Sequence, residues 1–230
     1  VSDTIKLTIS EGPVAHAGAD DAVCASETQY LIGDASSEGG SVLWTSSGDG
    51  SFDDPTVDNP LYTFGAGDFI TGSVALTMTV TGAIDTSTDD KIITINDLPS
   101  IMVDEHYDIS CNGLTDGFIN ISGMGGSGSY QFSIDGSPYQ VSGEFSGLSP
   151  GDYVLSLIDA NGCQNDTILT IAEPGVFSYN LDDVSHCSCF GVADGAISIT
   201  INGGTQPYAI SWTGPDGFSS TEEDLAGITA

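Results

Sequence analysis

Short runs in which apolar residues alternate with small or polar ones recur along the chain. The run 74–80 places Val, Leu, Met and Val at every second position, as a strand with one buried face does. The same period of two returns at 119–121, 130–134 and 153–157, between glycine-rich turns. Helix-favouring Leu, Lys and Arg are scarce, whereas Thr, Ser, Val, Ile, Tyr and Phe are frequent. We therefore predict an all-β fold.

Two similar segments indicate that the chain contains the ends of two related domains. The stretch "SDTIKLTISEGP" (2–13) is similar to "TDDKIITINDLP" (88–99). Each stretch has alternating apolar and polar residues, followed by an acidic residue and a proline. This pattern is typical of a last strand followed by a stiff exit. We expect the chain to begin inside the final strand of a preceding domain.

A second internal repeat has an offset of 78 residues. "CNGLTDGFINIS" begins at Cys111 and "CFGVADGAISIT" at Cys189, followed by "GGSGSYQFSIDG" and "GGTQPYAISWTGPDG". The first copy continues through "GDYVLSLIDANGC" to Cys163, whereas the second stops at Ala230. We expect this chain to be a part of a longer tandem array of repeats.

The repeats predict four segments along the chain. Residues 1–12 form the last strand of a truncated domain, 13–99 and 100–174 two β-sandwiches, and 175–230 a truncated sandwich. Prolines at the junctions and short linkers favour a semi-rigid rod.

Three stretches of the first sandwich resemble the PKD-like, immunoglobulin-like (Ig-like) domains of bacterial surface proteins. They are "AHAGADDAVC", "VLWTSSGDGSFDDPTVDNPLYTF" and "GSVALTMTVTG", which cover most of 13–96. The resemblance implies a two-sheet β-sandwich with Trp44 in its core and a turn at 48–50.

The next two segments resemble the SprB repeat of long surface adhesins from gliding Bacteroidota. The resemblance rests on "SCNGLTDGFINISGMGGSGSYQFSIDG" with "FSGLSPGDYVLSLIDANGC", and on "SCFGVADGAISITINGGTQPYAISW". It implies export by the type IX secretion system, display on the outer cell surface, and an adhesive or mechanical role in motility.

The five cysteines allow several interpretations. Cys111 and Cys163 flank one domain, and Cys111 shares its repeat position with Cys189, so we predict a Cys111–Cys163 disulfide. Two buried free thiols are the alternative. Cys24 is alone in its domain and is expected to be a small buried apolar residue. Cys187 has no assigned role, because "HCSC" lacks the further ligands of a zinc site.

The strongly acidic composition limits the classes of partner that the chain is expected to bind. The chain has 33 acidic residues, two lysines and no arginine. It is therefore not expected to bind nucleic acid or anionic membranes, which require Lys or Arg. The acids form a solvated surface, bind Ca²⁺, or do both, and no cofactor other than Ca²⁺ is expected. Candidate calcium ligands lie in loops and junctions: Asp20, Asp21, Asp53, Asp54, Asp58, Asp104, Glu105, Asp159, Asn161 and Asp166.

The sequence contains few candidate residues for catalysis or for covalent modification. Three histidines, no G-x-S-x-G and no distinctive carboxylate pair predict that the chain is not an enzyme. The triplet "DTI" occurs twice and looks like the Bacteroidota O-glycosylation acceptor, which makes Thr4 and Thr167 candidates, although both suit plain strand positions.

We therefore expect an extracellular structural fragment of a repetitive adhesin, with an external surface or polysaccharide and neighbouring domains as partners. A carbohydrate-binding module of a secreted polysaccharide-degrading protein, or a filament subunit, is the alternative. A sugar platform needs exposed rings. Alternation predicts Trp44 and Trp212 to be buried, which leaves Tyr107, Tyr139 and Phe218. The uncharged run 117–134 is too rich in Gly, Ser and Asn for membrane insertion.

Overall fold

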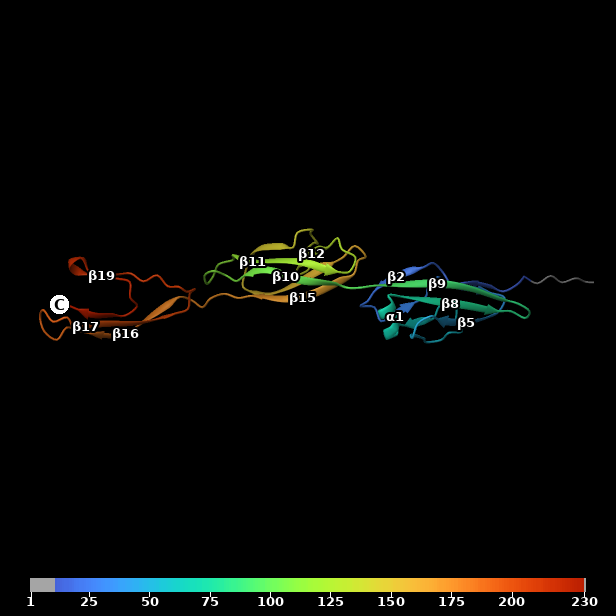
Figure 1. Cartoon of the computed structure of the whole chain (residues 1–230), viewed down its shortest axis with the longest axis horizontal. Helices are drawn as coiled ribbons and strands as arrows, with labels where there is room; N and C mark the ends of the chain where they lie inside the picture. Colours follow the sequence, from blue (N-terminus) through green and yellow to red (C-terminus); the bar gives the residue numbers. More distant parts are fainter. Residues whose placement is uncertain (1–10, 230) are drawn as a thin grey trace, which may run out of the picture. The chain divides into compact units, whose positions relative to one another are not determined.

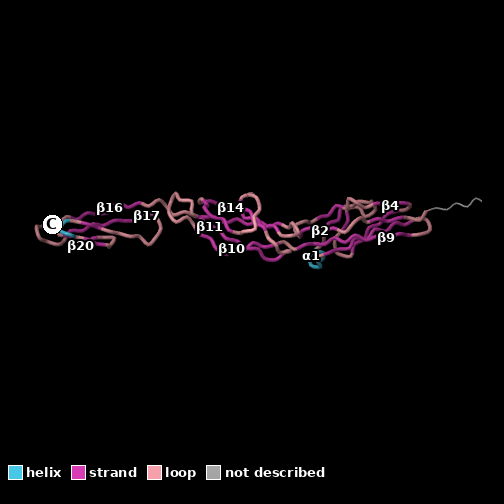
Figure 2. The backbone as a smooth tube through the Cα atoms, turned by 90° about the horizontal axis from the view of Figure 1, so that it is seen from above, coloured by secondary structure: helices cyan, strands magenta, loops and turns pink. Residues whose placement is uncertain are grey.

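The structure is a computed structural model that describes residues 11–229, and strands make up most of it. Figure 2 shows strands throughout residues 11–229. Helical structure within 11–229 consists of α1 (Ala66–Thr71) and a 3₁₀ turn at Pro215–Gly217. The prediction of an all-β fold with tandem sandwiches is confirmed (Figure 1). The predicted strand 1–12 lies almost wholly outside the described residues.

The first sandwich combines a four-stranded sheet, a three-stranded sheet and a short strand pair. In the larger sheet, β2 runs parallel to β9, whereas β8 pairs antiparallel with both β9 and β5. The four strands are β2 (Asp21–Cys24), β9 (Thr86–Asn96), β8 (Ser73–Thr81) and β5 (Ser41–Ser46). The smaller sheet has β3 (Gln29–Leu31), β7 (Leu61–Thr63) and β6 (Ser51–Phe52), and the pair is β1 (Val14–His16) with β4 (Ser36–Glu38).

The core of this sandwich follows the alternation in the sequence. The four apolar residues of β8 at 74, 76, 78 and 80 are at most 1% exposed. Trp44 is buried as expected, and its indole N–H donates to the Val57 carbonyl over 3.1 Å. Phe52 lies against it with ring centroids 6.0 Å apart. Burial of apolar area supplies the main driving force for the two sheets to pack.

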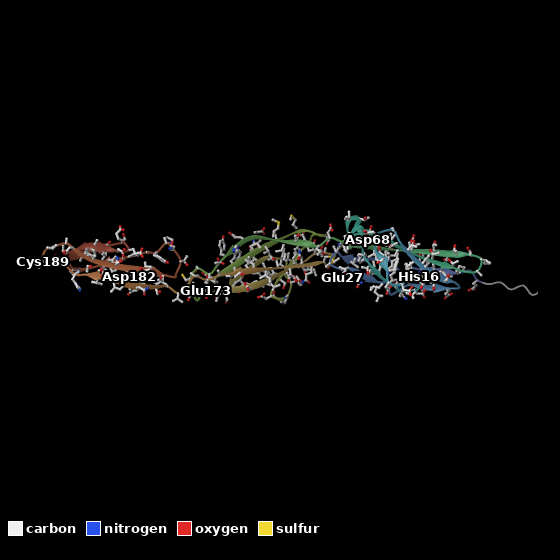
Figure 3. The ribbon with its side chains drawn as sticks, turned by 90° about the horizontal axis from the view of Figure 1, so that it is seen from below. His16, Glu27, Asp68, Glu173, Asp182 and Cys189 are labelled. Carbon is white, nitrogen blue, oxygen red and sulfur yellow. A yellow bond between two sulfur atoms is a disulfide. The ribbon has the colours of Figure 1, made fainter. Side chains whose placement is uncertain are left out.

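The turn at 48–50 requires glycine because the chain passes a buried tyrosine there. A Cβ atom on Gly50 would lie 2.3 Å from the Tyr62 hydroxyl. That hydroxyl donates to Asp68 over 2.9 Å, and the same carboxylate accepts the Gly65 N–H. Asp68 is 1% exposed on α1 (Figure 3) and was not identified from the sequence.

The second sandwich has two three-stranded sheets. They contain β10 (Pro99–Tyr107), β11 (Gly117–Gly125) and β13 (Glu144–Leu148), and β12 (Gln131–Ile134), β14 (Gly151–Ile158) and β15 (Gln164–Ile171). Its core includes Ile119, Leu155 and Leu157, each 0% exposed, at positions that the alternation predicted.

Contacts divide the chain into two units that differ from the predicted segments. The first unit holds the described residues up to Ile101 together with Gly123–Gln131 and Ser156–Asn165, and the second holds the rest. The predicted boundaries at 99 and 174 therefore stay predictions.

The last segment pairs β16 (Ser178–Ser185), β17 (Gly195–Asn202) and β20 (Leu225–Ile228) in one sheet, and β18 (Trp212–Thr213) with β19 (Ser219–Ser220) in another. Ile197 and Ile199 are half-buried, whereas their repeat equivalents Ile119 and Ile121 are buried. Up to residue 229, this segment has no strands after β20 to match β14 and β15, so its sheet is less covered.

A buried lysine carries the one strongly desolvated positive charge among residues 11–229. Lys91 is 2% exposed, and its Nζ lies 2.7 Å from Asp34 Oδ1 and 5.5 Å from the Tyr30 ring centroid. Burial alone would lower the pKa of Lys91, but hydrogen bonds to Asp34 and Tyr30 outweigh it and raise the pKa. The hydrogen bond from Lys91 lowers the pKa of Asp34. Both groups therefore stay charged at neutral pH.

We expect Asp34→Asn to destabilise the first sandwich by about 2 kcal/mol at pH 7, because a buried ammonium loses its counter-charge. This is below the roughly 3–5 kcal/mol of a fully buried pair, since Asp34 is half exposed. Urea unfolding measures the change, with the exposed Asp90→Asn as the matched control. Equal stability of the two variants would show that the pair contributes nothing.

Candidate functional site

A disulfide connects the end of a strand to a loop of the first unit that is far from it in the sequence. Cys24, the last residue of β2, is bonded to Cys163, which directly precedes β15. The Cα atoms lie 5.5 Å apart, across a sequence separation of 139 residues. The bond therefore joins the predicted segments 13–99 and 100–174 at their junction.

The predicted Cys111–Cys163 disulfide is wrong, and so is the prediction that Cys24 is unpaired. Cys111 is exposed and has no disulfide partner. Its turn contacts the far end of β15, where the Asn112 side chain donates to the Pro174 carbonyl over 3.1 Å. Cys163 precedes the other end of the same eight-residue strand. Such a strand is about 26 Å long, whereas bonded cysteines need Cα atoms within about 7 Å.

Hydrogen bonds on both sides of the disulfide hold the same loops together. The Ala25 N–H donates to the Asn96 carbonyl over 2.8 Å. The Asn161 side chain donates to the Asn96 side-chain oxygen over 2.8 Å, and Asn165 donates to the Pro99 carbonyl over 2.9 Å. The end of β9 and the start of β10 are thus tied to the loop that presents Cys163.

Asp159 organises that loop. Its carboxylate accepts the backbone N–H groups of Ser127, Asn161 and Cys163, each over 2.9 Å, while the residue is only 6% exposed. Burial would raise the pKa of Asp159, but these hydrogen bonds outweigh it and lower the pKa. The glycine turn 125–128 allows the approach, because a Cβ on Gly126 would lie 2.5 Å from Asp159 Oδ2. The turn joins two strands, as the sequence predicted.

The 78-residue repeat recurs in the hydrogen bonds of the structure. The Tyr130 hydroxyl donates to the Gly125 carbonyl over 2.5 Å, and the Tyr208 hydroxyl donates to the Gly203 carbonyl over 2.6 Å. Each bond closes the glycine-rich turn that precedes the next strand. The two copies therefore share side-chain interactions as well as sequence.

The cysteine-containing turns of the two copies also share one hydrogen bond, which an aspartate accepts. Asp116 accepts the Ser110 N–H over 3.1 Å, and Asp194 accepts the Ser188 N–H over 2.9 Å. These serine hydrogen bonds lower the pKa of both aspartates. Each carboxylate therefore serves as a turn cap.

A third equivalent pair lies between neighbouring strands of each copy. The Ser122 hydroxyl donates to Asp104 over 2.9 Å, and the Thr200 hydroxyl donates to Asp182 over 2.6 Å. Asp182 lies on β16 (Figure 3).

Cys187 occupies a core position of the repeat. Its equivalent is Ile109, which is 3% exposed. The Cys187 thiol is half-buried and donates to the Ile228 carbonyl over 3.1 Å. It therefore takes the place of an aliphatic side chain. Cys189, like Cys111, is exposed in its turn and has no disulfide partner (Figure 3).

The candidate calcium ligands of the first sandwich accept hydrogen bonds from nearby donors. Asp53 accepts the N–H groups of Asp54 and Leu61, and Asp54 accepts the Thr56 N–H and hydroxyl. Asp20, Asp21 and Asp58 accept the Ile92 N–H, the Tyr30 hydroxyl and the Ser37 hydroxyl, respectively.

The remaining candidate calcium ligands do not form a group either. Glu105 accepts the Tyr107 hydroxyl, and Asp166 lies in β15. Within residues 11–229 no three His, Cys, Asp or Glu side chains are grouped so that they could hold a metal ion. Calcium binding stays a prediction. So does glycosylation of Thr167, which is half-buried in β15, while Thr4 lies outside the described residues.

The part of the chain that the structure describes has no helix long and apolar enough to cross a membrane.

We expect digestion at aspartate under non-reducing conditions to identify the disulfide directly. Because the chain has only two lysines and no arginine, trypsin is unsuitable. Cleavage before aspartate places the three relevant cysteines in separate peptides, 21–33, 108–115 and 159–165. Mass spectrometry should find 21–33 linked to 159–165. A link between 108–115 and 159–165 would contradict the structure.

Asp159→Asn should destabilise the first unit by about 1–3 kcal/mol at pH 7, because three backbone N–H groups, of which that of Cys163 is buried, lose a charged acceptor. A carboxyl with a lowered folded pKa stabilises above its unfolded pKa, about 3.9, and this contribution is lost as the pH falls through the folded value. The difference from wild type should therefore close below about pH 4. Urea unfolding across pH measures it, with Asp90→Asn as the control; a gap independent of pH would contradict the role of the charge.

Comparison with known proteins agrees with the internal repeat. Residues 107–138 and 177–217 match the SprB repeat family, and both matched segments contain the Tyr–Gly turn bond. No curated protein sequence matches the chain.

The chain is also similar to several solved structures of low sequence identity. The N-terminal eight Ig domains of Down Syndrome Cell Adhesion Molecule isoform 1.30.30 match 91% of this chain and 30% of that chain, with a TM-score of 0.51 and 10% identity. Extracellular domains 3–5 of Drosophila OTK match 72% of this chain and 61% of that chain, with a TM-score of 0.39 and 11% identity.

The C-terminal 282-residue fragment of intimin, in complex with the intimin-binding domain of its translocated receptor, matches 61% of this chain and 54% of that chain, with a TM-score of 0.37 and 14% identity. The chain thus spans less than two thirds of each of these three structures. The first likeness shows the fold alone. The chain is therefore a tandem Ig-like β-sandwich protein that carries two segments similar to the SprB repeat.

Proposed function

We propose that this chain is a structural fragment of a long, repetitive cell-surface adhesin that is used in attachment or gliding motility. The observation that carries the proposal is the 78-residue repeat, in which two segments match the SprB repeat family and share three sets of hydrogen bonds. Repetition of one sandwich lengthens a protein without the need for a different fold.

The proposed parent protein is exported by the type IX secretion system of a Bacteroidota cell and displayed outside the outer membrane. Its sandwiches form a semi-rigid rod that contacts neighbouring domains, while other parts of the parent bind an external surface or polysaccharide. The formal charge of −31 supports a role as a shaft, because like-charged shafts repel one another and stay apart.

We expect antibodies raised against this chain to label intact producing cells, and brief protease treatment of whole cells to remove the label. Disruption of the gene should reduce attachment and gliding, and the parent stripped from the surface should have a denatured mass of hundreds of kilodaltons. Labelling only after permeabilisation, or a small parent with a catalytic domain, would contradict the proposal.

A carbohydrate-binding module is the second candidate, and one observation favours it. The sequence predicted only three exposed rings, but Phe177, Tyr179 and Phe190 are also 58%, 66% and 96% exposed. Trp212, which was expected to be buried, is half-buried beside an apolar groove of about 810 Å³ that Tyr179 and Tyr208 also line. Aromatic faces of this kind can stack on sugar rings.

Affinity electrophoresis in polysaccharide gels separates the two candidates. For an adhesin shaft we expect the same mobility for wild type and for variants with Tyr139→Ala, Phe218→Ala or Tyr179→Ala. Retardation of wild type that these substitutions abolish would instead support the carbohydrate-binding module. Leu31→Ala, an exposed apolar position in the first sandwich, is the control for nonspecific effects.

A further inference from the structure

The position of the disulfide in the chain determines which residues a stretching force can reach. Cys24 ends β2, and Cys163 precedes β15. All strands from β3 to β14 therefore lie in the covalent loop that the bond closes. Outside the loop remain β1 and β2 on one side, and β15 with all of the last segment on the other.

We propose that the Cys24–Cys163 disulfide is a covalent bypass that carries tension past strands β3 to β14 of the first two sandwiches. When the chain is pulled at its two ends, the force passes from Cys24 through the two sulfur atoms to Cys163. The loop between them cannot be extended, whether its strands are folded or not. This property goes beyond the proposed function, because it holds wherever the chain is stretched.

The length that the bond withholds is large. A sequence separation of 139 residues corresponds to about 460–500 Å of fully extended chain. The described residues on the N-terminal side, 11–24, can release only about 46–50 Å when they peel away. The oxidised chain can therefore extend only through the residues outside the loop, whereas the reduced chain gains the length of the loop as well.

Noncovalent contacts at the junction keep the two cysteines together in the folded protein. Asn96 accepts hydrogen bonds from Ala25, which follows Cys24, and from Asn161, which lies two residues before Cys163. The Pro99 carbonyl accepts a hydrogen bond from Asn165. Cys163 is 0% exposed, so a reductant has limited access to its sulfur atom while the junction is closed. The folded junction therefore shields the bond from reductants.

Single-molecule stretching of the 230-residue chain between handles ligated to its two termini tests the proposal. Cys187→Ala and Cys189→Ser are introduced as the background, which retains Cys111 and both bonded cysteines. We expect the fully extended oxidised chain to be about 460–500 Å shorter than the same chain after treatment with dithiothreitol. The reductant gives two electrons and two protons to the sulfur pair, yields two thiols, and itself becomes a cyclic disulfide.

The matched control adds Cys24→Ser and Cys163→Ser to the same background. Its extended length should be long without reductant and unchanged by it, even if the variant folds poorly, because fully extended length depends only on covalent connectivity. The last segment lies outside the loop, so its released length should be the same in every sample.

Two results would overturn the proposal. Equal extended lengths before and after reduction would show that no bond closes the loop. A difference of only about 170–190 Å would show that Cys111, and not Cys24, pairs with Cys163.

Discussion

Hydrogen bonds from backbone N–H groups to aspartate carboxylates are the interaction on which the cysteine-containing turns and the loop before β15 depend. The chain has 33 acidic residues and only two lysines, so most carboxylates cannot be matched by a positive side chain. Asp159, Asp116 and Asp194 instead accept N–H groups that their turns leave unpaired. The same kind of hydrogen bond thus satisfies backbone donors and fixes the direction of the chain, and it needs no salt bridge.

The same constraint explains the junction between the first two sandwiches. Asp159 binds the N–H of Cys163 and of two other residues, which fixes the position of the loop before β15. The end of β2 reaches the same place because β2 pairs in parallel with the last residues of β9. A carboxylate cap on one side and a parallel strand pair on the other bring two cysteines within bonding distance. The disulfide is thus a consequence of the polar contacts around it as well as a reinforcement of them.

Repetition gives the two SprB-like copies the same turns but different degrees of burial. Tyr130 and Tyr208 close equivalent glycine turns, so these short-range features depend on local sequence alone. Ile119 is buried and Ile197 is half-buried, because burial depends on which strands cover the sheet. The same reason applies to Trp212: alternation identified the inward-facing side of its strand, but no residue up to 229 covers that side fully.

The sequence by itself determined the strand alternation of β8, the core position of Trp44, the glycine turns and the 78-residue repeat, because each depends on neighbouring residues or on direct self-similarity. Tertiary structure alone decided that Asp68 and Lys91 are buried, that Cys187 replaces an aliphatic residue, and that Cys24 bonds Cys163. A disulfide requires two Cα atoms within about 7 Å, and no local pattern encodes a distance between residues 139 positions apart.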